Sequence, residues 1–163
     1  MYIIIPAYEP DKRLIQVVQD ITIKLPKARI IVVNDGSGPG YNDYYDETAF
    51  IGATVLTHPV NKGKGAALKT AFAYIQEEVV SQHQSAQPIV TVDSDGQHLI
   101  KDIVRVAEAT ENNPSHLILG ARAFVGKVPA RSRFGNKVTA GLFRLVTGQK
   151  VTDTQTGLRG MST

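Results

Sequence analysis

Short apolar runs alternate with amphipathic segments along this chain, and that alternation limits the folds it can adopt. Strands are predicted over residues 2–5, 29–34, 54–57, 89–93 and 116–119, where β-branched and other apolar residues cluster. Helices are predicted over residues 12–25, 41–51, 64–80, 99–110 and 136–146 from apolar residues at helical spacing. Strands that alternate with helices over short loops favour an α/β fold, with a mostly parallel sheet and helices on both of its faces.

The composition is typical of one globular domain. The chain has 163 residues, of which 42% are hydrophobic and 20% are charged, and this is enough to build a full core. The absence of cysteine excludes a disulfide framework and thiol chemistry. Neither a signal peptide nor an apolar run of membrane-spanning length is predicted. We expect a single domain over residues 1–163 that is truncated at its C-terminus, because Gly160 to Thr163 resembles the start of another strand.

Distinctive residues follow the predicted strands at the points where those strands end. Along the chain they are Pro6, Ala7, Tyr8 and Glu9; Asp35; Lys64 within Gly63-Lys64-Gly65; Asp93, Ser94 and Asp95; and Arg122. The carboxyl ends of parallel strands meet at one edge of a sheet, and ligands of open α/β sheets bind outside that edge. We therefore expect these residues to converge on one site, which an ordinary turn at each position would not require.

Asp93 and Asp95 are the strongest candidates for a metal site. They are separated by one residue, so in an extended backbone their side chains point the same way. Two facing carboxylates repel each other unless a cation lies between them, and hard oxygen ligands suit Mg²⁺ or Mn²⁺. Gly96 permits a sharp turn beside the ion, and His98 is a further candidate for a role there. The alternative interpretation is that Asp-Ser-Asp-Gly forms an ordinary turn.

The net charge of +3 is unevenly distributed. Residues 112–152 contain no acidic side chain and seven basic ones, namely Arg122, Lys127, Arg131, Arg133, Lys137, Arg144 and Lys150. A segment of one sign indicates an anionic partner such as a phosphate, a nucleic acid or a lipid surface, although a solvated helix face has a similar composition. Aromatic residues that could stack on bases are sparse there, which disfavours nucleic acid. Asp153, which follows this segment, is a candidate base or orienting group, or else a turn carboxylate.

Two common nucleotide-binding motifs are absent from the sequence. The chain lacks the spacing of a P-loop, and it lacks Gly-x-Gly-x-x-Gly after the first strand, which argues against a nicotinamide dehydrogenase. Gly63-Lys64-Gly65 before a helix could still bring backbone amides and an ammonium group near a phosphate. Asp35, at the tip of a strand, could accept a hydrogen bond from a base or a ribose.

Six motifs resemble, in the same order, those of the inverting glycosyltransferases of family 2, which have the GT-A fold. They are Ile5-Pro6-Ala7-Tyr8-Glu9, Val33-Asn34-Asp35-Gly36-Ser37, Asn61-Lys62-Gly63-Lys64-Gly65-Ala66, Asp93-Ser94-Asp95-Gly96-Gln97, Gly120-Ala121-Arg122 and Asp153-Thr154-Gln155-Thr156-Gly157-Leu158-Arg159. The resemblance extends over almost the whole chain. It is greatest to the branch that contains dolichyl-phosphate mannose synthase and bacterial polyprenyl-phosphate glycosyltransferases. It departs after Tyr8, where the family often has Asn-Glu-Glu and this chain has Glu9-Pro10-Asp11.

The resemblance implies a role for each candidate residue. The implied nucleotide-binding residues are Pro6, Ala7, Tyr8, Glu9, Asp35, Lys64, Asp93 and Ser94. Asp93, Asp95 and Gln97 would hold Mg²⁺ or Mn²⁺. Arg122, Arg131 and Arg133 would bind an acceptor phosphate or the donor diphosphate, and Asp95 and Asp153 are the implied catalytic residues.

The implied function is inverting transfer of a sugar from a UDP- or GDP-linked nucleotide sugar, with UDP favoured, to a polyprenyl phosphate at the cytoplasmic face of a membrane. A phosphate acceptor is favoured because the basic segment supplies partners that a hydroxyl would not need. Transfer to a saccharide hydroxyl in cell-wall or surface polysaccharide synthesis is an alternative. Others are a nucleotide-sugar-binding module and a nucleotidyltransferase, although the Gly-rich, Arg-containing loop of the latter is not found after the first strand. No nucleic-acid partner is expected.

Overall fold

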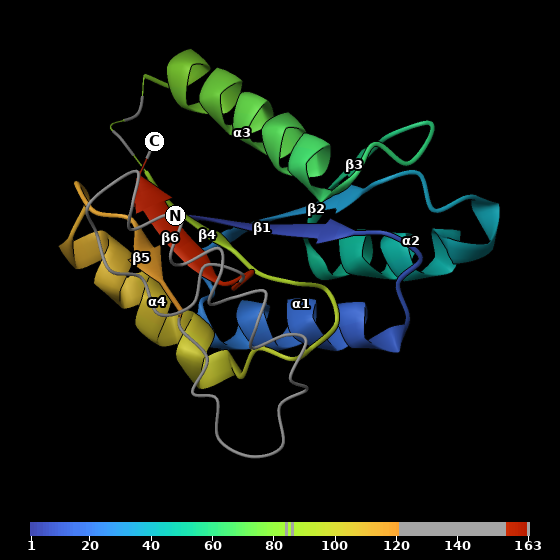
Figure 1. The fold of residues 1–163 in the computed structure, drawn as a ribbon, viewed down its shortest axis with the longest axis horizontal. Helices are drawn as coiled ribbons and strands as arrows, with labels where there is room; N and C mark the ends of the chain where they lie inside the picture. The colour runs from blue at the N-terminus through green and yellow to red at the C-terminus, as the bar shows by residue number, and fades with distance from the viewer. Residues whose placement is uncertain (84, 86, 121–155, 163) are drawn as a thin grey trace, which may run out of the picture.

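The computed structural model describes residues 1–83, 85, 87–120 and 156–162 (Figure 1). Its elements are β1 (Tyr2–Ala7), α1 (Lys12–Lys24), β2 (Arg29–Asn34), the 3₁₀ helix η1 (Pro39–Tyr41), α2 (Asn42–Ile51), β3 (Thr54–Thr57), α3 (Lys64–Ser81), β4 (Pro88–Thr91), α4 (Ile100–Asn112), β5 (Ile118–Leu119) and β6 (Arg159–Ser162). The helix predicted over residues 136–146 lies outside the described residues.

The strands form one mixed sheet in the order β3-β2-β1-β4-β6-β5. β1 pairs in parallel with both β2 and β4, and β2 pairs in parallel with β3. β6 runs antiparallel to both of its neighbours, β4 and β5, so β5 points the same way as the parallel strands. The prediction of an α/β fold with a mostly parallel sheet is confirmed, as is the further strand at the end of the chain.

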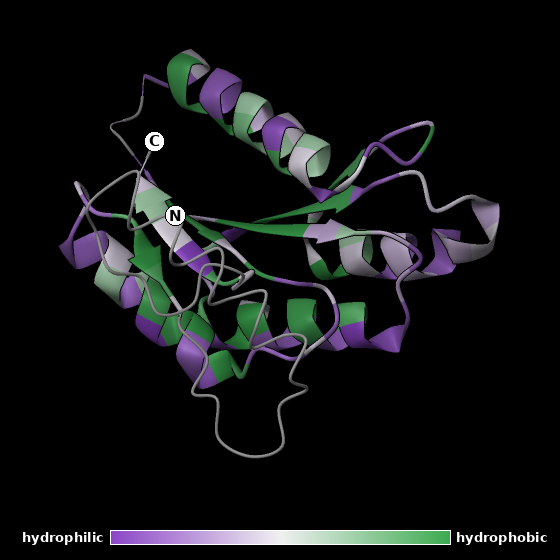
Figure 2. Cartoon of the chain, in the orientation of Figure 1, coloured by the Kyte–Doolittle hydropathy of each residue, from purple (hydrophilic) through white to green (hydrophobic). Residues whose placement is uncertain are grey.

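Helices cover both faces of the sheet, with α3 on one face and α1, α2 and α4 on the other (Figure 1). β1 is buried along its whole length because its side chains alternate between these two layers. Ile3 and Ile5 pack in the cluster that contains residues of α1, α2 and α4, whereas Ile4 packs against α3 residues such as Ala71 and Ile75. The central strands accordingly contribute apolar side chains to both faces, and Figure 2 shows hydrophobic colour along much of β1 and β2.

Helix α1 shows how local sequence sets an element boundary. The Asp11 side chain caps its N-terminus by accepting a hydrogen bond from the Arg13 N–H at 2.9 Å. Leu14, Val17, Val18 and Ile21 form the buried stripe, and the helix ends at Lys24, just before the Leu25-Pro26 pair. The predicted end at residue 25 is therefore wrong by one residue, and Leu25 is the C-cap.

Several other predicted boundaries need correction. β4 ends at Thr91 rather than Asp93, since Val92 makes the last backbone hydrogen bond to β1, at 2.9 Å, before the chain turns. β5 begins at Ile118 rather than residue 116, because the N–H of His116 instead donates to Asn113 in a turn at 3.0 Å. The predicted helix over 41–51 begins one residue later, after η1. The helix predicted over 64–80 ends at 81, and that predicted over 99–110 runs over 100–112.

The turn after β2 depends on a close approach at Gly36. Gly36 has a φ of +75°, and a Cβ added there would lie 2.2 Å from the carbonyl carbon of Val60. The neighbouring Ser37 N–H donates to the Asn34 side chain at 2.9 Å, which closes the turn. Gly38 has the same φ of +75° but faces open space. The two glycines therefore share the same φ but differ in steric contact.

We expect Gly36→Ala to destabilise the fold far more than Gly38→Ala. Both variants place a side chain at positive φ, which costs about 1–2 kcal/mol. Gly36→Ala also forces the loop that contains Val60 to move, so its total loss of unfolding free energy should reach about 2–4 kcal/mol. Urea denaturation of the two variants and the wild type measures the difference. Equal losses for both would show that the close approach to Val60 contributes nothing.

Candidate functional site

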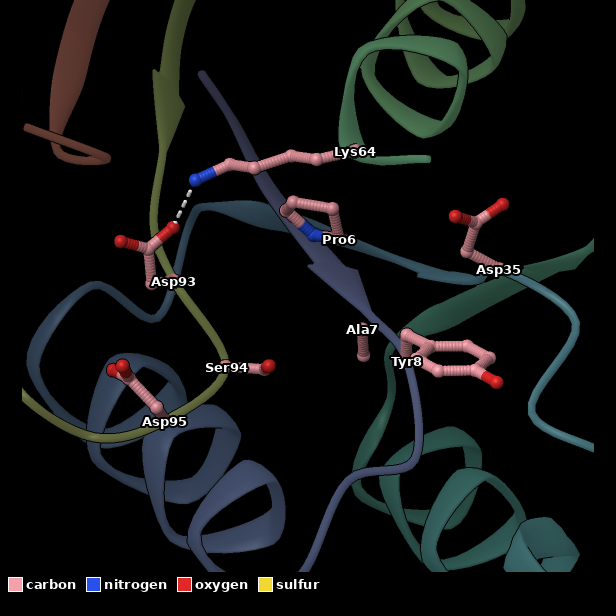
Figure 3. Close-up of a pocket in the computed structure, with 8 residues that line it drawn as sticks. All are labelled: Pro6, Ala7, Tyr8, Asp35, Lys64, Asp93, Ser94 and Asp95. Carbon is pink, nitrogen blue, oxygen red and sulfur yellow. Dashed lines mark hydrogen bonds and ion pairs between the residues drawn. The ribbon is translucent and has the colours of Figure 1, made fainter. Parts of the chain in front are cut away.

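A cavity of about 240 Å³ opens at the carboxyl ends of β1, β2 and β4 (Figure 3). Its lining residues are Pro6, Ala7, Tyr8, Asp35, Lys64, Asp93, Ser94 and Asp95. Figure 3 shows Asp93, Asp95 and the end of the Lys64 side chain on one side of it, and Asp35 and Tyr8 on the other. The expected convergence at one edge of the sheet is thus what the structure shows for these residues.

Asp93 lies at the centre of a charged cluster. Its carboxylate pairs with the Lys64 ammonium group, and its Oδ2 accepts a hydrogen bond from Nε2 of His98 at 3.2 Å. The hydrogen bond from His98 is the main cause of a pKa well below the usual range for this carboxyl; burial opposes the shift and the Lys64 charge reinforces it. His98 is itself partly buried, with 8% of its side chain exposed. The predicted candidate His98 is therefore in direct contact with Asp93.

The backbone around Gly157 supports Asp93 from the end of the described chain. A Cβ at Gly157 would lie 2.0 Å from Asp93 Oδ2, so only glycine leaves room for the carboxylate. The Thr91 hydroxyl donates to the Gly157 carbonyl at 2.8 Å. The Thr156 hydroxyl donates to the Gly120 carbonyl at 2.7 Å. Sequence reasoning gave no role to these residues, although Thr156 and Gly157 lie within one of the six motifs.

Asp95 lies in the turn that follows β4 and not in an extended segment, which corrects the geometry expected for the pair. Its Oδ1 accepts a hydrogen bond from the Gln97 N–H at 3.0 Å, and Gly96 has a φ of +70°. Asp-Ser-Asp-Gly therefore forms the turn that the alternative interpretation expected. Asp93 and Asp95 nevertheless line the same cavity.

The donor set of the cavity fits a divalent cation that arrives together with phosphate. The described residues contain no group of three or more His, Cys, Asp or Glu side chains able to hold a metal. Asp93 and Asp95 do line one cavity, however, and Mg²⁺ commonly needs only one or two carboxylates when substrate phosphates and water complete its shell. Gln97 lines a second cavity with His98 and Leu158, and is not among the residues of the first.

Asp35 at the opposite side of the cavity is held in a different way. Its Oδ1 accepts hydrogen bonds from Nδ1 of His58 at 2.7 Å and from the Lys62 N–H at 3.0 Å. Burial raises the pKa of Asp35, but these hydrogen bonds outweigh it, and the pKa is lower than that of an ordinary aspartate. His58 was not singled out in the sequence, because its contact with Asp35 spans 23 positions.

Tyr8 lines the cavity, whereas its neighbour Glu9 does not. Tyr8 is 48% exposed and lines the cavity, and the adjacent Glu9 carboxylate raises the pKa of its hydroxyl. Glu9 has a φ of +48°, its N–H donates to the Ser37 hydroxyl at 2.9 Å, and it is not among the cavity-lining residues. The predicted residues Arg122, Arg131, Arg133 and Asp153 lie outside the described residues.

The lowered pKa of Asp93 predicts an acid-dependent loss of stability. Because the folded pKa lies below the unfolded value of about 4, the ionised carboxylate stabilises the fold above that pH, and the effect is lost on further acidification. Asp93→Asn should therefore be less stable than the wild type at pH 7, with a difference that shrinks below about pH 4. Lys64→Met keeps the carboxylate and His98, so it should retain part of the dependence. Urea melts in chelator from pH 7 to 2 measure this, and a constant difference for Asp93→Asn would contradict it.

Comparison with known proteins agrees with this fold and these motifs. Residues 2–162 match the profile of "Glycosyl transferase family 2". A UDP-N-acetylglucosamine–dolichyl-phosphate N-acetylglucosaminyltransferase of Methanococcus voltae is 29% identical over 180 residues, which cover 99% of this chain and 69% of that protein. A polyprenol monophosphomannose synthase of Mycolicibacterium smegmatis is 26% identical over 164 residues, which cover 96% of this chain and 59% of that protein. These names support the predicted resemblance to the polyprenyl-phosphate branch.

The fold also resembles that of a solved glycosyltransferase. The structure titled mannosyltransferase PcManGT from Pyrobaculum calidifontis, in complex with GDP-Man and Mn²⁺, aligns with a TM-score of 0.51 at 18% identity, covering 71% of this chain and 33% of that one. This likeness confirms the predicted GT-A fold. An uncharacterized protein of Methanocaldococcus jannaschii is 28% identical over 172 residues, and this chain spans 64% of its length. Because the family profile extends over nearly every residue, the chain belongs to glycosyl transferase family 2.

Proposed function

We propose that this chain transfers a sugar, with inversion, from a nucleoside diphosphate sugar to a polyprenyl phosphate. The observation that carries the proposal is the polarity of the cavity in Figure 3. One side offers Asp93, Asp95 and Lys64, whose charges suit a diphosphate and its cation, and the other offers Tyr8 and Asp35, which suit a base and a ribose. Pro6, Ala7 and Ser94 lie between or beside these groups and complete the nucleotide site.

The donor diphosphate needs positive charge as its bond to the sugar breaks. A divalent cation held by Asp93 and Asp95 would offset the negative charge that develops on the leaving group. Lys64 is the other positive group of the cavity, and its ammonium can pair with a phosphate oxygen in place of Asp93. His98 and the Gly157 backbone keep the Asp93 carboxylate in position during such an exchange.

The acceptor assignment rests on the basic segment and on the relatives. A polyprenyl phosphate is anionic near neutral pH, so its oxygen can attack the anomeric carbon without a base. We propose that Arg122, Arg131 and Arg133 bind this phosphate or the donor diphosphate, and that Asp153 orients the complex. With a saccharide hydroxyl as acceptor, Asp153 would instead have to remove the proton. Two similar proteins are named for dolichyl phosphate and polyprenol acceptors, which supports the lipid phosphate.

The lipid acceptor places the reaction at a membrane surface, and we propose the cytoplasmic face. The basic residues of 112–152 would favour an anionic lipid surface. No helix in the described part of the chain is long and apolar enough to cross a bilayer. UDP is the favoured donor nucleotide, in line with the donor in the name of the Methanococcus voltae relative, while the solved mannosyltransferase is bound to a GDP sugar.

The nucleotide assignment is tested by calorimetric titration of UDP and GDP with and without Mn²⁺. We expect one nucleotide to bind more tightly with Mn²⁺, and Asp95→Ala to weaken that binding about tenfold or more because a metal-linked carboxylate is lost. Asp46→Ala removes an exposed carboxylate of α2 and should leave the affinity unchanged. Failure of the wild type to bind either nucleotide would contradict the proposed function, and wild-type affinity in Asp95→Ala would contradict the metal assignment.

The acceptor assignment is tested separately with Asp153→Asn. If the acceptor is a lipid phosphate, transfer should fall only partly, because no proton has to be removed. If the acceptor is a hydroxyl, transfer should fall by about 10²–10⁴-fold. Radiolabelled sugar transfer to a short polyprenyl phosphate and to a saccharide distinguishes these results. Transfer to the saccharide alone would replace the lipid acceptor with the hydroxyl alternative.

A further inference from the structure

His58 is a buried polar residue that the transfer reaction described above does not use. It follows β3, and its N–H donates to the Asn34 carbonyl at 2.9 Å, so its backbone is tied to the end of β2. Only 6% of its side chain is exposed. Both ring nitrogens have partners: Nδ1 lies 2.7 Å from Asp35 Oδ1, and Nε2 lies 2.8 Å from the Thr70 hydroxyl on α3. The His58 ring therefore links Asp35, which follows β2, to helix α3.

The chemistry of these contacts fixes which ring nitrogen carries a proton. An ionised carboxylate has only lone pairs to offer, so Nδ1 of His58 must be the donor to Asp35. Its other nitrogen is then held by the Thr70 hydroxyl, which keeps the ring from rotating. The lowered pKa of Asp35 agrees with a carboxylate that stays ionised.

The same contacts leave one carboxylate oxygen of Asp35 directed to the cavity. The hydrogen bonds from His58 and from the Lys62 N–H both end on Oδ1, and the Gly63 N–H also faces the carboxylate. Asp35 lines the cavity, and Oδ2 is the carboxylate oxygen that neither of these two hydrogen bonds occupies, so Oδ2 is the oxygen left for a ligand. An oxygen held in this way can only accept a hydrogen bond.

We infer that His58 and Thr70 position Asp35 as a fixed acceptor that selects a nucleobase with a ring N–H. This inference rests on the proposed nucleotide site and adds two positioning residues to it. A base that presents a ring N–H, as uracil and guanine do, would donate to Asp35 Oδ2. Cytosine presents a lone pair at the corresponding nitrogen, which the carboxylate repels.

The competing explanation is that the bridge only braces α3 against the sheet. A brace would affect every ligand of the cavity and the stability of the fold alike. A positioning role affects ligands that carry a base and spares those that carry only phosphates. The phosphate side of the cavity, at Asp93 and Lys64, has no hydrogen bond to His58 or Thr70, so the two effects are separable.

The test compares the affinities of three probes by calorimetry in the presence of Mn²⁺: the tighter binder of UDP and GDP, CDP, and inorganic pyrophosphate. His58→Ala should weaken the first probe about tenfold, shrink its preference over CDP, and leave pyrophosphate within about twofold. His58→Asn keeps a donor near the Nδ1 position and should recover a large part of the loss. Thr70→Val should show a smaller loss in the same direction. His116→Ala, at an exposed histidine, is the matched control and should change nothing.

Several results would overturn the inference while leaving the nucleotide site in place. One is nucleotide affinity in His58→Ala equal to that of the wild type. Another is an equal loss for the nucleotide and for pyrophosphate without rescue by His58→Asn, which is the signature of a brace. Nitrogen-15 NMR of the wild-type imidazole provides a readout that needs no ligand, and an unprotonated Nδ1 in His58 would also overturn the inference. Failure of the wild type to bind any nucleoside diphosphate would instead contradict the proposed function itself.

Discussion

The parallel pairing of β1 with both β2 and β4 is the constraint on which the rest of the molecule depends. It aligns Ala7 with Asn34 at one edge of the sheet and brings the end of β4 to the same edge. β1 is buried on both faces, as a strand at the centre of the two layers is expected to be. Residues as far apart in the sequence as Pro6 and Asp95 therefore line one cavity.

The cavity keeps its two principal carboxylates ionised by different physical means. Asp93 is stabilised by a cationic neighbour, Lys64, together with His98, and this ion pair can be exchanged for another cation or for a phosphate partner. Asp35 is stabilised by hydrogen bonds from the His58 ring and from the Lys62 backbone N–H, in a more buried setting. In the proposed function, the exchangeable ion pair of Asp93 lies where the diphosphate and its cation would bind, and the fixed Asp35 lies where the base would be recognised.

Sequence patterns could predict the helices, the strands and the edge of the sheet where the site lies, because all three depend on the order of residues within short segments. Apolar periodicity placed the helices and strands to within one or two residues, and the strand ends then located Asp35, Lys64 and Asp93 together. The patterns could not predict what touches these groups. The bridge from Asp35 through His58 to Thr70, and the glycine against Asp93, depend on the packing of distant segments. Glu9 and Gln97 are the opposite case. Each lies within two residues of a cavity-lining residue in the sequence, but neither lines the cavity.

Strand β6 and the residues just before it pack beside Asp93. By pairing between β4 and β5, it brings Gly157 against the Asp93 carboxylate and the buried Leu158 against the core. Gly160 within it passes so close to Thr110 of α4 that an added Cβ would lie 1.8 Å from the hydroxyl. Strand β6 is thus held within the sheet between β4 and β5, with Thr110 of α4 packed against Gly160. The position of the Asp93 carboxylate, which we propose as a metal ligand, therefore depends on this last segment as well as on the motif that contains Asp93 itself.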